Sequence, residues 1–122
     1  MRRSERGSVS IVAAASMAVI AALAMGCADL ARVLVFVGRA DTAADSAALA
    51  AAQELALPTG RVPADVAAEY ADHNGATLVE CRCDAGSSEA VVTVEMDVGP
   101  MLLVPGGRTV TAQARAVVDS GA

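Results

Sequence analysis

The sequence contains few of the residues from which catalytic sites and large hydrophobic cores are built. It has one Tyr, one Phe and no Trp in 122 residues. Because aromatic side chains usually dominate core energetics, any core must be thin and built from Val, Leu and the 29 alanines. His73 is the single histidine, so no triad can contain more than one imidazole base. It lies beside Asp72 near a predicted helix end and is best interpreted as a solvated surface residue, so we expect neither an enzyme nor a bound cofactor.

Cysteine is also scarce, and its odd count gives no closed disulfide framework. Cys27 lies in an apolar segment, whereas Cys81 and Cys83 form a pair two residues apart. The pair is open to three interpretations: two buried small residues on a strand, an internal disulfide, or a disulfide to another chain in an oxidising exterior. Together with His73 it lacks a fourth ligand at a spacing typical of zinc sites, so we expect no metal centre.

Charge is absent from residues 7–28, and this segment organises the rest of the chain. At a rise of about 1.5 Å per residue, a helix of this length covers about 33 Å, enough to cross a hydrocarbon core of about 30 Å. Three arginines precede the segment and Asp29 follows it. By the positive-inside rule we predict a cytoplasmic basic leader at residues 1–7, a membrane span at residues 8–28 and an extracytoplasmic remainder.

Two alternatives to a retained membrane anchor remain open for this segment. A secretory signal peptide would end at the small residues of 22–24 or 25–27, but the apolar part exceeds the usual length of about 7–15 residues. A lipoprotein leader would attach lipid to Cys27, but the mature chain would then begin with the apolar residues 30–37 instead of a polar tether. The retained anchor is therefore the preferred interpretation.

One face of the predicted span carries small side chains at every fourth residue. This small-residue ladder consists of Ala14, Ala18, Ala22 and Gly26. Such spacing lets a second helix approach closely, so it predicts a helix-packing face in the membrane. A helix this rich in alanine also gives the spacing by chance, which is the alternative explanation.

Charge is unevenly distributed along the chain. Residues 1–40 carry a net charge of +3, and residues 41–122 carry −8. Because nucleic-acid binding depends on neutralising phosphates with Lys and Arg, the acidic part is a poor candidate for it. We expect a membrane and protein partners, and no nucleic acid.

The predicted helix does not stop at the membrane. Residues 29–57 contain no Pro and keep one apolar face, whereas residues 58–60 end the helix. Asp29 and Arg32 are three residues apart and can form a weak ion pair. Residues 8–57 then form one helix of about 75 Å, whose outer part is suited to close packing. Its predicted buried face is mostly alanine: Val33, Val37, Ala40, Ala44, Ala47, Ala48, Ala51 and Leu55.

Residues 58–122 are predicted to form a small exported module. A short helix over residues 63–74 begins at a Pro and stops at an Asn-Gly pair. Its predicted inward residues are Val62, Val66 and Tyr70. After Gly75 a period of two predicts three antiparallel strands, with the apolar residues 101–104 between the second and third. Their predicted inward residues are Thr77, Val79, Cys81 and Cys83; Ala90, Val92, Val94, Met96 and Val98; and Val110, Ala112, Ala114, Ala116 and Val118.

The predicted fold class is therefore α+β. A long N-terminal transmembrane helix continues outside the membrane and is followed by one short helix and a three-stranded antiparallel sheet. A module of about this size buries little surface by itself, so we expect it to depend on the long helix or on a partner.

Several segments resemble the TadE/TadG-like proteins of Flp-type (tight adherence) pilus systems. They are the Arg6-Gly7 pair, the apolar helix that follows, and the stretch RADTAADSAALAAA at residues 39–52. The strand-like residues 110–116 are similar to the end of the family's C-terminal half. The resemblance implies a minor pseudopilin, cut after Gly7 by a prepilin peptidase to leave Ser8 as the new N-terminus, and packed helix to helix.

The chain differs from the family pattern at Val12. The pattern usually has a Glu five residues after the Gly, and that carboxylate is implied to pair with a neighbouring subunit's N-terminus. The difference fits a TadE-like relative that keeps its anchor or assembles without this salt bridge. We expect a structural or accessory component of a pilus or secretion system in the cytoplasmic membrane, with pilin-like subunits and inner-membrane assembly proteins as partners. The alternative is an exported binding or effector domain, released by signal cleavage or lipid-anchored at Cys27.

Overall fold

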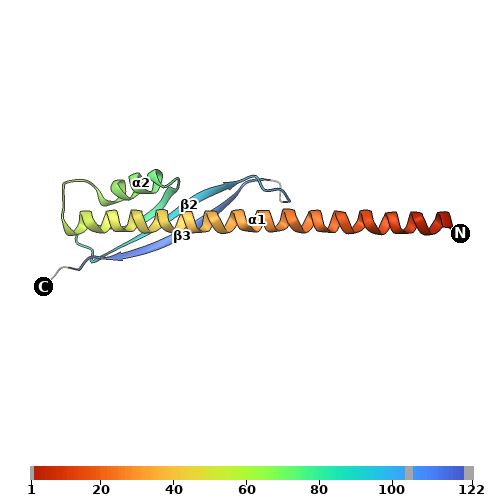
Figure 1. Cartoon of the computed structure of the whole chain (residues 1–122). Coiled ribbons are helices and arrows are strands. Elements are labelled where there is room, and N and C mark those ends of the chain that lie inside the picture. Colours follow the sequence, from red (N-terminus) through yellow and green to blue (C-terminus); the bar gives the residue numbers. More distant parts are fainter. Residues whose placement is uncertain (1, 104–105, 120–122) are drawn as a thin grey trace.

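The computed structural model describes residues 2–103 and 106–119, with side chains from residue 7 onward, and shows an α+β architecture. Val104, the end of the apolar segment expected between the last two strands, lies outside the described residues. The elements follow one another in the order α1 (Arg2–Ala56), α2 (Pro63–His73), β1 (Thr77–Arg82), β2 (Glu89–Gly99) and β3 (Arg108–Val117) (Figure 1).

Helix α1 is a single uninterrupted helix of 55 residues. At about 1.5 Å per residue it is about 80 Å long. It begins at Arg2, so it includes most of the segment that we expected to form a separate leader before Ser8. Its N-terminal part extends beyond the rest of the molecule, whereas its C-terminal part lies alongside α2 and the sheet (Figure 1).

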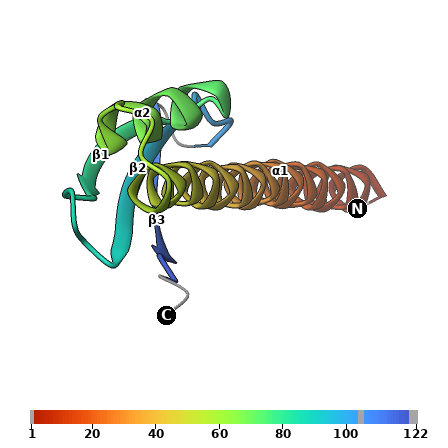
Figure 2. The same cartoon turned by 90° about the vertical axis from the view of Figure 1, so that its left-hand side faces the viewer.

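The sheet has the order β1-β2-β3, and both neighbouring pairs are antiparallel, as predicted. Helix α1 packs against β2 and β3, and helix α2 packs against α1 and β1. The view along α1 shows both helices on one side of the sheet (Figure 2). The other face of the sheet carries exposed polar residues such as Glu95, Gln113 and Arg115. The module therefore has two layers, and α1 supplies a large part of one of them.

The core is built mainly from alanine and valine. The predicted alternation of β2 and β3 is confirmed, since their inward residues are buried or partly buried. In α1 the buried surface is wider than predicted, because α2 and the sheet enclose the helix from two sides. Val37 remains exposed, and Phe36 packs against the core instead. The buried alanines of α1 are Ala40, Ala43, Ala44, Ala47, Ala48, Ala50, Ala51 and Ala52.

The predicted inward line of α2 is wrong at two of its three positions. Val66 is buried, but Val62 is 57% exposed and Tyr70 is 42% exposed. Ala67 and Ala71 are buried in their place. The physical reason is that α2 packs against the alanine surface of α1, where only small side chains allow two helix backbones to approach closely. The bulkier residues therefore lie at the edge of the contact.

The predicted inward face of β1 is wrong at Thr77 and Val79, and a β-bulge explains why. The pairing register shifts between Leu78 and Glu80, so Val79 is an extra residue without a partner on β2. A bulge moves every earlier residue of the strand to the opposite face. Leu78 therefore packs against the core, whereas Val79 is exposed. From Cys81 onward the predicted phase is correct, and Cys83 is buried.

The predicted stop of α2 is confirmed in detail. Gly75 adopts a φ of +77°, the left-handed conformation that glycine accepts most readily. Its N–H donates to the Asp72 carbonyl at 2.9 Å, and the N–H of Ala76 donates to the Ala71 carbonyl at 2.9 Å. Together these bonds form a Schellman motif that ends the helix and directs the chain into β1.

A buried carboxylate fixes the turn between α1 and α2. Glu54 is 8% exposed, and its carboxylate accepts hydrogen bonds from the Thr59 N–H at 2.6 Å and the Arg61 N–H at 3.2 Å. The Thr59 hydroxyl lies 2.9 Å from the same carboxylate. The backbone hydrogen bond from Thr59 is the main cause that lowers the pKa of Glu54 below its ordinary value of 4.5. No sequence pattern predicted this interaction, because it joins the end of α1 to the turn that follows it.

We expect Glu54→Gln to reduce the acid sensitivity of the fold. Because folding lowers the pKa of Glu54, its stabilising effect is complete above the ordinary value and is lost as the pH falls through the folded pKa. Wild-type thermal stability, followed by circular dichroism in detergent, should therefore fall between about pH 7 and about pH 3 by more than that of Glu54→Gln. Asp41→Asn, which removes an exposed carboxylate from the same helix, is the matched control and should behave like wild type. Equal acid sensitivity in wild type and Glu54→Gln would contradict this role.

Candidate membrane and helix-packing surface

The N-terminal half of α1 presents large apolar side chains that nothing in the described structure covers. The segment from Gly7 to Ala56 contains a window long and apolar enough to cross a membrane, and none of that window is buried. Isolated apolar residues on a surface are ordinary, but a helix that exposes apolar side chains over this length indicates a surface that contacts lipid or other helices. Its large exposed residues are Val9, Ile11, Val12, Met17, Val19, Ile20, Leu23, Met25 and Leu30.

The small-residue ladder lies on this surface, and its two ends differ. Ala14, Ala18 and Ala22 are exposed along the free part of the helix. Gly26 is half-buried, because the Leu103 Cδ1 atom lies 3.6 Å from the position that a Cβ on Gly26 would occupy. The chain's own β2–β3 loop therefore covers the last step of the ladder and leaves three steps available to another helix.

Asp29 marks the point where α1 enters the folded module. Its side chain is only 8% exposed, although it follows a long uncharged segment. The carboxylate accepts hydrogen bonds from the backbone N–H groups of Leu102 and Leu103, each at 2.8 Å. These bonds attach the β2–β3 loop to α1 across 73 and 74 residues of sequence. Hydrogen bonds to a charged acceptor are among the stronger ones, so this contact sets the position of the loop along the helix.

Arg32 does not form the weak ion pair with Asp29 that we expected. Its guanidinium lies 6.0 Å from the centroid of the Phe36 ring, in a cation–π arrangement. Its Nη2 atom lies 3.4 Å from the position that a Cβ on Gly99 would occupy. Arg39, three residues beyond Phe36, also lies near this ring, with its guanidinium 5.4 Å from the ring centroid. After the uncharged segment, the cationic side chains of α1 therefore resume at Arg32, three residues beyond Asp29.

The three cysteines lie in two separate environments. Cys27 is a free, exposed thiol on the apolar part of α1. Cys81 and Cys83 are joined by a disulfide, with their Cα atoms 5.4 Å apart. His73 lies near Tyr70, with ring centroids 6.2 Å apart. Among the described residues, no group of three His, Cys, Asp or Glu side chains is placed to hold a metal ion.

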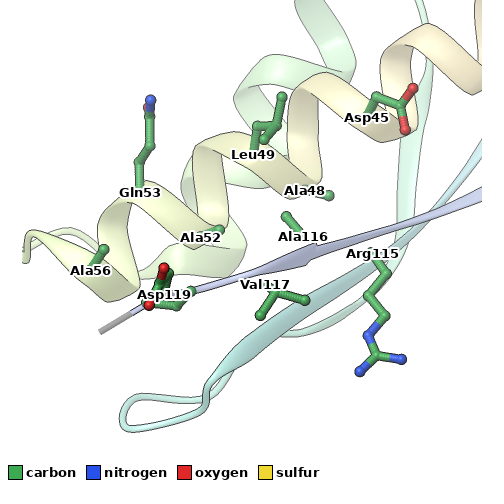
Figure 3. Close-up of a pocket in the computed structure, with 11 residues that line it drawn as sticks. Asp45, Ala48, Leu49, Ala52, Gln53, Ala56, Arg115, Ala116, Val117 and Asp119 are labelled. Carbon is green, nitrogen blue, oxygen red and sulfur yellow. The ribbon is translucent and has the colours of Figure 1, made fainter. Parts of the chain in front are cut away.

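A shallow groove of about 430 Å³ lies between α1 and the edge strand β3 (Figure 3). Ala48, Ala52 and Ala116 form its floor, and Asp45 lies at one end. Arg115 points away from the helix, where it pairs with Glu89 on the neighbouring strand. The groove thus presents small apolar side chains and no convergent acid–base or nucleophilic group among its described lining residues.

Comparison with known protein families finds a match to most of α1. Residues 7–54 match the family model described as "Putative Flp pilus-assembly TadE/G-like". This segment is therefore similar to the TadE/G-like family. The match confirms the resemblance noted in the sequence and covers most of α1, from the start of the apolar part to the alanine face of the core. Comparisons with curated proteins and with solved structures find no match.

The match relates the chain to pilus assembly through its helix and leaves α2 and the sheet outside the matched region. It covers both the exposed ladder and Asp29. Sequence reasoning found the ladder by its spacing of four, but it missed the role of Asp29. The available signal was a lone carboxylate at the end of an apolar helix in a chain that also carries an apolar loop at residues 101–104.

We expect Asp29→Ala to release the β2–β3 loop from α1. Without the carboxylate, the N–H groups of Leu102 and Leu103 lose their acceptor. Their amide hydrogens should then exchange at least about tenfold faster, because a hydrogen bond to a charged group contributes about 1.5–3 kcal/mol. Hydrogen exchange of the full chain, resolved to residues by NMR or mass spectrometry, measures this directly. Asp41→Ala serves as the control, and unchanged exchange at residues 102 and 103 in Asp29→Ala would refute the contact.

Proposed function

We propose that the protein is a TadE-like structural or accessory component of a pilus or related secretion system. In this proposal it is a single-pass membrane protein that acts through helix–helix packing and not through catalysis. The observation that carries the proposal is the coincidence of the family match at residues 7–54 with the uncovered apolar half of α1. A long apolar helix that packs on nothing in its own chain requires either lipid or partner helices around it.

The proposed topology places the N-terminus in the cytoplasm and the module outside. Three arginines precede the span, and basic residues beside a span favour the cytoplasmic side. The Cys81–Cys83 disulfide supports an extracytoplasmic module, since disulfides persist in oxidising compartments. Residues 8–28 then lie in the membrane, and the packed part of α1 supports the module directly above it.

The proposed partners are other TadE/TadG-like or pilin subunits and inner-membrane assembly proteins. Ala14, Ala18 and Ala22 are exposed and small, so a partner helix can approach the α1 backbone closely along them. If a prepilin peptidase processes the chain, the cut after Gly7 leaves a helix that begins at Ser8. Val12 is 62% exposed and offers an apolar contact at the position where the family pattern usually has a carboxylate.

An exported binding or effector domain is the second candidate function. It is favoured by the exposed thiol of Cys27, the residue that would carry a lipid. The course of α1 supports the membrane anchor instead, because the helix runs through Cys27 without a break and is attached to the module immediately afterwards at Asp29. Cleavage at or before Cys27 would remove most of the uncovered apolar part of the helix that the family match includes.

The double substitution Ala14→Leu with Ala18→Leu tests the proposed packing face. Bulky side chains there would hold a partner helix away, and association should weaken by about 1 kcal/mol, or about fivefold. Association is measured by cross-linking within native host membranes, followed by detection of pilus subunits and of a second, tagged copy.

The matched control is Ala13→Leu with Ala24→Leu, which adds the same volume on a different face of the same helix, about 120–140° around its axis from the mean direction of Ala14, Ala18 and Ala22. We expect this variant to associate as wild type does. Equal cross-linking by both double variants would show that the ladder is not the packing face.

A further inference from the structure

We propose that the β2–β3 loop is a second membrane contact, in which residues 101–103 enter the lipid interface beside the point where α1 leaves the bilayer. This inference rests on the proposed function, because it requires α1 to span the membrane. In this proposal the module has its own lipid-binding surface and lies directly on the bilayer.

The first observation is that the loop exposes large apolar side chains. Leu102 is 67% exposed and Leu103 is 49% exposed. They do not stand alone, because Leu103 lines an apolar groove together with Leu23, Gly26 and Leu30 of α1. The loop therefore extends the apolar surface of the proposed membrane span sideways, and this continuity points to the same lipid environment.

The second observation is the position of the loop along α1. The hydrogen bonds from residues 102 and 103 hold it at the level of Asp29, the first charged residue after the uncharged segment. If residues 8–28 lie in the hydrocarbon region, this level is the outer interface of the bilayer. The end of β2 from which the loop starts lies toward the free end of α1, away from the C-terminal end of the helix (Figure 1).

The third observation concerns the backbone of the loop. An irregular segment can approach lipid only if its polar backbone groups have partners within the protein. The N–H groups of Leu102 and Leu103 both donate to the Asp29 carboxylate, which is itself nearly buried. Asp29 thus satisfies the backbone donors beneath the two exposed leucines. This arrangement suits an apolar environment and is unnecessary for a loop that stays in water.

The fourth observation is the charge around the loop. Arg32 lies against Gly99 at the end of β2, and the exposed Arg108 begins β3 on the other side of the loop. Arginines at this level can reach lipid phosphates while their stems lie along apolar surface. Two cationic side chains that flank an apolar tip complement an anionic lipid surface, the occupant that the continuity of the loop with the apolar part of α1 also indicates.

Tryptophan fluorescence tests the proposal directly, because the chain has no Trp of its own. Three single variants of the full chain, Leu102→Trp, Leu23→Trp and Leu57→Trp, are reconstituted in vesicles of phosphatidylcholine and phosphatidylglycerol. All three leucines are exposed in the described structure, so each can be replaced without disturbing the core. Spin-labelled lipids that carry the quencher near the head group or deep in the acyl chain report the depth of each Trp.

We expect Leu102→Trp to be quenched several-fold more by the shallow label than Leu57→Trp, which marks the far end of α1. Leu23→Trp should be quenched by the deep label. If Leu23→Trp is quenched and Leu102→Trp behaves like Leu57→Trp, the loop does not contact lipid and the inference fails while the membrane anchor stands. If Leu102→Trp shifts to shorter wavelength without lipid quenching, protein covers the loop and the inference also fails. If neither is quenched, the proposed membrane span fails and this inference with it.

Discussion

The structure depends on the close contact between the alanine face of α1 and the elements that surround it. Ala44, Ala47 and Ala51 are fully buried, and the largest fully buried side chains of the module are only valines. Small residues let the helix backbone approach the sheet and α2 closely, which compensates for the near absence of aromatic side chains. Among the described residues, the buried core of the module includes the alanines of α1 and is not separate from that helix. The same helix continues into the proposed membrane span, so the module cannot turn independently of it.

Two buried carboxylates connect loops to this helix, one near its C-terminal end and one where it enters the module. Glu54 binds the turn that leads to α2, and Asp29 binds the loop between β2 and β3. Each accepts backbone N–H groups that would otherwise lack partners, which is a common requirement for buried or lipid-facing backbone. The helix is thus the reference for both ends of the module. A partner that packs on the free part of α1 would therefore fix the orientation of the whole exported part.

Much of the fold follows from sequence periodicity, and the differences have physical causes. The alternation of β2 and β3 was sufficient to predict their buried face. The alanine spacing of α1 predicted the centre of its buried face but not the wider surface that α2 and the sheet enclose. Val79 was assigned to the wrong face because a bulge changes the phase of a strand without a Gly or Pro to mark it. Tyr70 was assigned inward because it continues the line of Val62 and Val66, whereas the contact between the two helices buries Ala67 and Ala71. The contacts of Asp29 could not be predicted, because they join residues that only the tertiary fold brings together. At the candidate site, the spacing of four identified the ladder, but the cover that Leu103 places on Gly26 was equally inaccessible.

The proposed function requires that the apolar half of α1 stays in the mature protein as a membrane anchor and is not removed as a leader. Intact mass and N-terminal sequencing of the protein extracted from native membranes test this most directly. We expect the chain to start at Met1, or at Ser8 if a prepilin peptidase acts after Gly7, and its mass to show no lipid on Cys27. A chain that starts at Cys27 or later would contradict the account, since the helix-packing surface would then be absent from the mature protein.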